Sequence, residues 1–316
     1  MQSAPDVRIT GSGLVTSLGA SRKATLAAVK AGERVRGEPF PFLAHTPYSG
    51  CLAAQEQEPD LRDRIADRRM RKFMSRHAEL AAVAAREALE EADLPARGIA
   101  PERIGLYAGV GLAAMDIAVS TKLLRASLDE EGAFSMDHFS RDGLRTIHPL
   151  WSFHVLANMP ACIVSILEGI KGDNGIYTPW EDQTAFALLE AAYALHEGTI
   201  DAAVVVASDT PSHPASMVEL ASFDFIAPGE IVAPGAACLV LERPDTTAPI
   251  QPFSRLSSLR LCASEKEDAT PIDPLAPVIG RTLAAAPLLL AILGPALELP
   301  CCLYGCSGHR FSFEAT

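Results

Sequence analysis

Long apolar runs and positive charge are both scarce in this chain of 316 residues. Its most apolar segment, residues 282–297, is interrupted by Pro287, Gly294 and Pro295, so we expect it neither to span a membrane nor to anchor in one. Lys and Arg number 27 against 39 Asp and Glu, and the net charge of −12 argues against a nucleic-acid surface. The chain opens without a charged-then-apolar signal segment, which leads us to expect a cytoplasmic protein with no membrane partner.

Patterns for a metal, a cofactor or a catalytic thiol are also weak. The seven cysteines come without a secretory signal, so we expect them to be reduced. Cys301, Cys302 and Cys306 with His309 raise a zinc hypothesis, which the lack of paired CxxC spacing disfavours. Cys306 has no visible base or helix N-terminus beside it to make it a nucleophile. The segment GSGLVTSLG does not match GxGxxG, because its third glycine arrives too late. We therefore expect neither a metal nor a cofactor.

The composition favours a layered α/β protein. With 48% hydrophobic but only 6% aromatic residues, the chain can bury a sizeable core of small aliphatic side chains. Strand-type and helix-type segments alternate along it, which predicts a mainly parallel central sheet covered by helices. Strands are expected near residues 7–11, 104–108, 175–178, 202–207 and 236–241.

Two helices are predicted with particular clarity. Residues 70–92 carry one apolar stripe at helical spacing. The stripe consists of Phe73, Leu80, Ala81, Ala84, Ala88 and Ala92. Asn158 with Pro160 indicates a helix start and Gly169 a helix stop, so residues 162–167 are expected to form a short buried helix.

The segment GDNGIYTPWEDQTAFALLEAA, residues 172–192, indicates a strand, a sharp turn and a helix N-terminus. We call residues 180–182 of this turn the elbow. A helix N-terminus stabilises an anion, and Glu181 would be stable there as a carboxylate. A carboxylate attacks thioesters poorly, so it cannot serve as a durable acyl carrier. The alternative is that Glu181 and Asp182 are simply acidic residues at a helix start.

Five further segments resemble, in order, those of the β-ketoacyl synthase family, and in particular its chain-length-factor subunits. They are VRITGSGLVTSLG (7–19), DRRMRKFMSRHAELAAVAAREALEEADL (67–94), PERIGLYAGVG (101–111), HPLWSFHVLANMPACIVSILEGIKGDN (148–174) and GAACLVLERPD (235–245). The resemblance implies a thiolase-like layered α/β fold, with a complete N-terminal half (1–245) and a truncated C-terminal half (246–316). The family's catalytic cysteine falls on Glu181, and a register shifted by one residue would place Trp180 there.

The family's second half normally supplies two histidines and a lysine, and we find neither segment that would carry them. Residues 303–315, LYGCSGHRFSFEA, resemble the family's final hairpin. In that alignment Cys306 replaces a gating phenylalanine and Arg310 an asparagine, so His309 is expected to be a hairpin residue. His154, His196 and His213 show no spacing to a partner and are expected to be surface or satisfied core residues. The resemblance therefore implies no catalytic residues.

The expected function is that of a non-condensing, chain-length-factor-like subunit, which is a catalytically inert part of a β-ketoacyl synthase complex. It would pair with an active ketosynthase in type II polyketide, polyene or fatty-acid-like biosynthesis. The abbreviated C-terminal half suggests a pathway of the aryl-polyene type. Acyl carrier protein would dock mainly on the partner, because this chain is acidic. Two alternatives stay open: an independent malonyl-carrier decarboxylase, and a scaffold that only stabilises its partner.

Residues expected to shape the acyl-chain tunnel lie in two places. By correspondence with chain-length factors, Ile117, Ser120 and Leu124 fall on gate-lining positions, and Trp180 is a further candidate. Their spacing of three and four places the first three on one helical face. The alternative is an ordinary core stripe. One basic concentration, within residues 62–76, is expected to be a solvated stretch before the long helix rather than a carrier-docking site.

Overall fold

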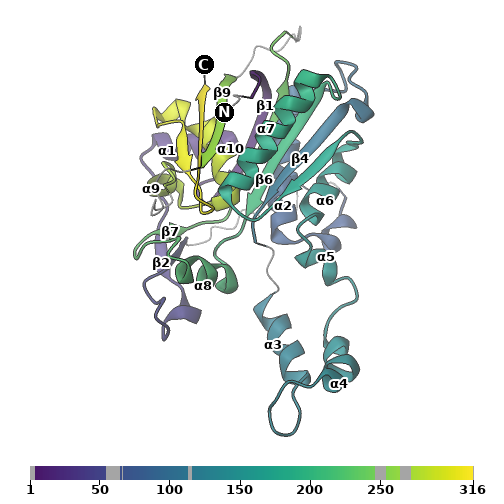
Figure 1. Cartoon of the computed structure of the whole chain (residues 1–316), viewed down its shortest axis with the longest axis vertical. Coiled ribbons are helices and arrows are strands. Elements are labelled where there is room, and N and C mark those ends of the chain that lie inside the picture. The colour runs from purple at the N-terminus through teal and green to yellow at the C-terminus, as the bar shows by residue number, and fades with distance from the viewer. Residues whose placement is uncertain are drawn as a thin grey trace.

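The structure is a computed structural model that describes residues 4–54, 65, 67–112, 116–245, 254–263 and 272–315. Its centre is an eight-stranded sheet in the order β10-β11-β9-β1-β8-β6-β4-β5, beside a small sheet in the order β2-β3-β7 (Figure 1). The strands are β1 (Val7–Thr16), β2 (Gly37–Pro39), β3 (Leu52–Ala54), β4 (Ile104–Val110), β5 (Asn174–Tyr177), β6 (Ala202–Asp209), β7 (Ile231–Val232), β8 (Gly235–Glu242), β9 (Ser254–Ala263), β10 (Cys302–Tyr304) and β11 (His309–Ala315).

The five strands predicted from the sequence are all present, but the prediction of a mainly parallel sheet is wrong. In the described part of the large sheet, β4 runs parallel to β5 and β6, whereas every other pairing is antiparallel. Alternation of strands and helices does not fix strand direction. The connection that contains α8 returns β8 antiparallel to β6, and a tight turn joins β10 to β11.

Helices cover both faces of the large sheet. The helices are α1 (Arg22–Lys30), α2 (Arg76–Ala92), α3 (Ile117–Ala126), α4 (Met136–His138), α5 (Ser152–Val155), α6 (Met159–Glu168), α7 (Glu181–Glu197), α8 (Pro214–Ser222), α9 (Ala276–Ile279) and α10 (Ala286–Leu293). Short 3₁₀ and π turns lie at Pro41–Leu43, Met70–Phe73, Pro101–Arg103, Phe139–Gly143, Leu144–Thr146, Leu283–Ala285 and Pro295–Leu297. No helix in the described residues is long and apolar enough to cross a membrane.

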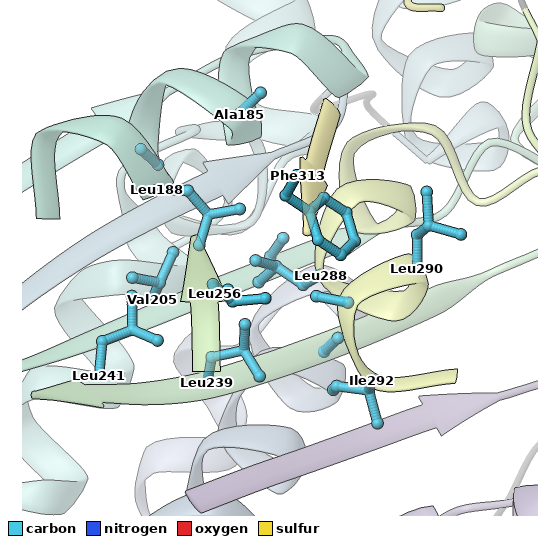
Figure 2. Packing of buried hydrophobic residues seen from close by; sticks show 14 of the residues in the cluster. Ala185, Leu188, Val205, Leu239, Leu241, Leu256, Leu288, Leu290, Ile292 and Phe313 are labelled. Carbon is cyan, nitrogen blue, oxygen red and sulfur yellow. The ribbon is translucent and has the colours of Figure 1, made fainter. Parts of the chain in front are cut away.

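Successive side chains along each strand point to opposite faces of the sheet, which divides the core into two layers. On β6, Ala203, Val205 and Ala207 pack with α7 and α10, whereas Val204 and Val206 pack with α2 and α6. Figure 2 shows the first layer, where leucines of α7, β8 and α10 meet beneath the C-terminal strand. The predicted core of small aliphatic residues is therefore confirmed, with alanine allowing close approach of helix to sheet.

The two clearest helix predictions need only boundary corrections. The long helix begins at Arg76 rather than at residue 70, because Ser75 caps it by accepting a hydrogen bond from the backbone N–H of Ala78. A 3₁₀ turn occupies Met70–Phe73 instead. Helix α6 ends at Gly169 as predicted, where the backbone turns to a positive φ of 69°. It is buried on one face only, since Ile166 is exposed.

Residues 117–146, which contain α3 and α4, project beyond the body of the molecule, and we call them the arm (Figure 1). Leu123 is the one buried residue of α3, and Asp116 caps that helix through the N–H groups of Ala118 and Val119. The arm thus contributes little to the core of the described chain.

The C-terminal strands extend the same sheet. β9 pairs with β1, and β11 pairs with β9, so residues 254–315 continue the layer formed by the earlier strands. The predicted hairpin within residues 303–315 is confirmed as β10 and β11. The division of the chain at residue 245 stays a prediction.

Candidate functional site

The elbow lies where the sequence predicts it. β5 ends at Tyr177, and α7 begins at Glu181 with Trp180 as its N-cap residue. The first turn of α7 approaches β4 closely, because Gly109 has no side chain: a Cβ there would lie 1.8 Å from Thr184 Oγ1. Thr184 Oγ1 donates a hydrogen bond to the carbonyl of Ala284 at 2.7 Å. The position of the elbow is therefore fixed from two sides.

Glu181 forms a buried ion pair with Arg281, and each side chain is only 1% exposed. Arg281 Nη2 lies 3.0 Å from Glu181 Oε1. Arg281 Nη1 donates to the carbonyl of Phe225 and lies 3.6 Å from Glu230 Oε2. Burial alone would lower the pKa of Arg281, but the surrounding carboxylates raise it, so the guanidinium stays charged. The charge at the elbow is thus compensated inside the chain.

Cys306, in the turn between β10 and β11, is the third group at the elbow. Its backbone N–H donates to Glu181 Oε2 at 3.3 Å, and its Sγ lies 3.7 Å from both Glu181 Oε1 and Arg281 Nη2. Burial and the Glu181 carboxylate raise the pKa of the Cys306 thiol, and Arg281 offsets only part of this. No helix N-terminus was expected beside Cys306, but the structure places the first residue of α7 there. The thiol nevertheless stays protonated and is a poor nucleophile.

Asp182 binds the other side of the same hairpin. It is fully buried, and its carboxylate oxygens lie 3.0 Å from Ser307 Oγ and from His309 Nδ1. His309 is therefore a hairpin residue, as predicted, that holds α7 to β11. Glu181 and Asp182 are buried first-turn residues that each contact specific side chains, those of Glu181 being buried and those of Asp182 lying nearer the surface, so they do more than begin a helix.

The residues of the zinc hypothesis point to different partners. Cys302 Sγ accepts from Arg310 Nε at 3.1 Å, whereas Cys306 and His309 contact Glu181 and Asp182. Within the described ranges, no group of three or more His, Cys, Asp or Glu side chains is arranged to hold a metal ion.

Two more carboxyl groups are buried near the ion pair. Asp209, at the end of β6, accepts from the backbone N–H of Ala284 at 3.1 Å, and burial together with the charge of Glu181 raises its pKa well above the usual value. Asp273 accepts from the N–H of Leu275 at 2.9 Å, and burial raises its pKa to about 7. The surroundings of the elbow therefore hold more acid groups than Arg281 alone neutralises.

This arrangement restricts the chemistry of the elbow. A carboxylate paired with a buried guanidinium has its lone pairs occupied and its charge compensated, so it is poorly placed to attack an acyl group or to accept a proton. Sequence reasoning found Glu181 but missed Arg281. The one feature of the sequence that marks Arg281 is its position immediately before the most apolar run, residues 282–297.

Three of the predicted gate residues lie on α3, and the fourth, Trp180, belongs to the elbow. Ile117, Ser120 and Leu124 are on α3, and Leu124 is 54% exposed, so the ordinary core stripe is the wrong explanation of their spacing. Trp180 packs edge-on against Phe225, with the ring centroids 5.7 Å apart. A role for these four residues in a tunnel stays a prediction.

Two adjoining cavities, of about 250 and 510 Å³, lie near the base of the arm, and residues of the arm line the larger one. Asp116 and His154 line both of them. From α3 itself, Val119 lines the larger cavity, whereas Ile117, Ser120 and Leu124 line neither.

Comparison with known proteins identifies the family. The family model described as Beta-ketoacyl synthase, N-terminal domain, matches residues 4–245, which is well over half of the chain. The chain therefore belongs to the β-ketoacyl synthase family. A 3-oxoacyl-(acyl-carrier-protein) synthase 2 from Staphylococcus aureus is 27% identical over 206 residues, which are 65% of this chain and 46% of that synthase. The chain thus aligns with about half of the length of this relative.

Solved structures agree on the fold. A type II PKS acyl-carrier protein in complex with its ketosynthase bound to the hexaketide (AntDE:AntF) gives a TM-score of 0.77 at 14% identity, covering 99% of each chain. The ishigamide ketosynthase/chain length factor gives 0.71 at 16% identity, covering 98% of each. A β-ketoacyl synthase from Burkholderia phymatum gives 0.62 at 21% identity, covering 86% of this chain and 67% of that one. The predicted thiolase-like α/β fold is therefore confirmed.

Proposed function

We propose that this chain is a non-condensing subunit that pairs with an active ketosynthase and helps to shape the tunnel for its growing acyl chain. The observation that carries the proposal is the buried Glu181–Arg281 ion pair, which occupies the elbow where the family keeps its cysteine. A carboxylate held in this way supports an inert elbow over a malonyl-carrier decarboxylase that would need Glu181 to orient substrate.

Exposed apolar side chains support the pairing. Among the described residues, eight of the thirteen large apolar side chains that are exposed fall between residues 124 and 176: Leu124, Leu128, Phe134, Met136, Leu144, Leu156, Ile166 and Ile176. Such a concentration is typical of an interaction surface. Beyond residue 245, Ile272 is the one exposed large apolar side chain in the described part of the chain.

The edge strand of the large sheet carries one of these eight side chains. β5 ends the strand order and pairs on one side with β4, and Ile176 on β5 is exposed. An exposed strand edge offers unpaired backbone groups to another chain. A partner that covered this edge together with the arm would satisfy both features.

The partner would be a ketosynthase with its own cysteine, two histidines and lysine, and acyl carrier protein would bind mainly to that partner. The net charge of −12 supports this division, because carrier proteins are acidic. The structural likeness to a ketosynthase/chain length factor is consistent with such a pair. The predicted cytoplasmic location and aryl-polyene pathway stay part of the proposal.

The test is to produce this chain and the ketosynthase encoded beside it, separately and together, and to measure the mass of the complex and the length of its products. We expect a heterodimer, with products that lengthen when Leu124 becomes Ala. The matched control is Leu144→Ala, another exposed leucine of the arm. A stable monomer beside every neighbouring synthase would refute the pairing. Two results would reduce this chain to a scaffold. One is an intact Leu124→Ala heterodimer with unchanged products, and the other is a ketosynthase that makes the same products alone.

A further inference from the structure

Three histidines from separate parts of the chain line one cavity. His77 comes from α2, His154 from α5 and His213 precedes α8, and all three line the cavity of about 250 Å³. The cavity lies at the carboxyl ends of two parallel strands, because Val110 ends β4 and Thr210 follows β6. This end of a sheet is where open α/β proteins generally bind ligands.

The lining carries little negative charge. Asp116 is the one carboxylate among the described lining residues, and its Oδ1 accepts the N–H groups of Ala118 and Val119, at 2.9 and 3.0 Å. Arg76 also lines the cavity and pairs with Glu79 at 3.1 Å. The charge of Asp116 is therefore directed into the first turn of α3.

Four helices begin at this cavity. The lining includes the N-cap residues of α2, α3 and α8, which are Ser75, Asp116 and His213, and Pro160 in the first turn of α6. Each of these helices has at least nine residues. The N-terminus of a helix carries a partial positive charge, so those of α2, α6 and α8 raise the potential inside the cavity, whereas Asp116 offsets that of α3.

His77 provides an independent indication of a ligand. The residue is 7% exposed; its Nε2 is hydrogen-bonded to Thr210 Oγ1, and its Nδ1 has no partner among the described residues. Burial, with a further contribution from His213, lowers the pKa of His77 to about 4. Nδ1 of His213 accepts the N–H of Ala215 at 3.2 Å, so neutral His213 carries its proton on Nε2. An anion beside Nδ1 of His77 would stabilise the protonated form of that ring, which burial disfavours.

We propose that this cavity is a binding site for a small oxyanion, a carboxylate or a phosphate group, held by His77 and His213 beside the N-termini of α2, α6 and α8. His154 stands at the opening, where its Nε2 donates to the carbonyl of Lys72 at 3.1 Å, and Lys72 lines the adjoining cavity. The site goes beyond the pairing function, since it needs no partner chain.

The test is an NMR titration of the histidine ring nitrogens in the full chain with inorganic phosphate, malonate and sulfate, each at about pH 6 and about pH 8. Sulfate keeps its charge across this range and so reports protonation of the protein alone. We expect saturable binding that shifts the His77 and His213 signals and is at least about tenfold tighter at the lower pH, because binding stabilises the protonated His77 ring. Tighter binding of malonate than of phosphate would identify a carboxylate ligand, and the reverse order a phosphate.

Variants make the test specific. His213→Asn and His77→Asn should each weaken binding about tenfold or more, whereas the exposed His196→Asn, at the far end of α7, should bind like the wild type. His213 is only partly buried, so its variant remains informative if His77→Asn fails to fold. Absence of saturable binding, or equal affinities of wild type and His213→Asn, would overturn the proposal.

Discussion

The elbow and the arm bury their side chains to opposite extents. At the elbow, Glu181 and Arg281 are each 1% exposed and neutralise one another. On the arm, Leu124 is 54% and Met136 68% exposed, and both are apolar. The place where a ketosynthase would do its chemistry is therefore closed by the chain's own charges. The apolar side chains of the arm are exposed, and in the proposed pair the partner would bury them.

The largest effect should come from breaking the elbow's ion pair. Replacing Arg281 by Met leaves Glu181 buried without a counter-charge, and we expect a loss of about 3–5 kcal/mol in the free energy of unfolding, measured with urea. Adding Glu181→Gln should restore much of it. The control is Arg255→Met at the exposed pair with Asp6, which should cost about 0–1 kcal/mol. Equal losses in the free energy of unfolding from the two arginine variants would show that the buried pair contributes no more than the exposed pair.

A second effect should come from pH. The folded chain holds a proton on Asp273 up to about pH 7, whereas the unfolded carboxyl loses it near pH 4. The contribution of Asp273 to stability is thus fully present below the unfolded pKa and is lost as pH rises through the folded pKa. Asp273→Asn cannot ionise and keeps an acceptor for the N–H of Leu275.

We therefore expect Asp273→Asn to gain stability relative to wild type, by about 2–4 kcal/mol, between about pH 4 and about pH 8. Urea unfolding at both pH values measures the change. The exposed Asp137→Asn is the control, for which the difference from wild type should change little. A difference for Asp273→Asn that is constant with pH would mean that this carboxyl does not hold a proton in the folded chain.

The proposed pairing can be tested with two exposed isoleucines, neither of which is on the arm. Ile166 on α6 is 63% exposed and lies within the apolar surface, whereas Ile272 is 54% exposed and lies far from it in the sequence. Ile166→Ser should weaken the complex with the ketosynthase about tenfold, and Ile272→Ser should not. Both should change the stability of the isolated chain by less than about 0.5 kcal/mol. Calorimetry of binding measures the affinity for the ketosynthase. Equal affinities of the two variants would show that Ile166 does not belong to the interface.

The smallest effect should come from the basic stretch before α2. Arg69 and Lys72 lie in its described part, and Arg62 and Arg64 lie outside the described residues. Arg69 is largely exposed and pairs with Asp67 at 3.5 Å. Charge reversal at Arg69 and Lys72 should leave stability within about 0.5 kcal/mol and carrier affinity unchanged. A clear loss of carrier affinity would establish docking on this chain.

Much of this fold was readable from local patterns, and the rest depends on contacts that are distant in sequence. The start of α7 follows from a strand, a proline and helical spacing, and the end of α6 follows from Gly169. Arg281 could not be paired with Glu181 in advance, because 100 residues separate them.

The exposure of α3 and the histidine cavity were equally hidden. An amphipathic helix has the same spacing whether its apolar face meets the core or another chain, so the pattern of Ile117, Ser120 and Leu124 could not decide between them. His77, His154 and His213 belong to three different elements that only the folded chain brings together.

The most direct test of an inert elbow is the intact mass of both chains after the purified pair has been incubated with an acyl donor on its carrier protein. We expect the acyl adduct on the ketosynthase alone, with the mass of this chain unchanged. An acyl adduct on this chain would contradict the account.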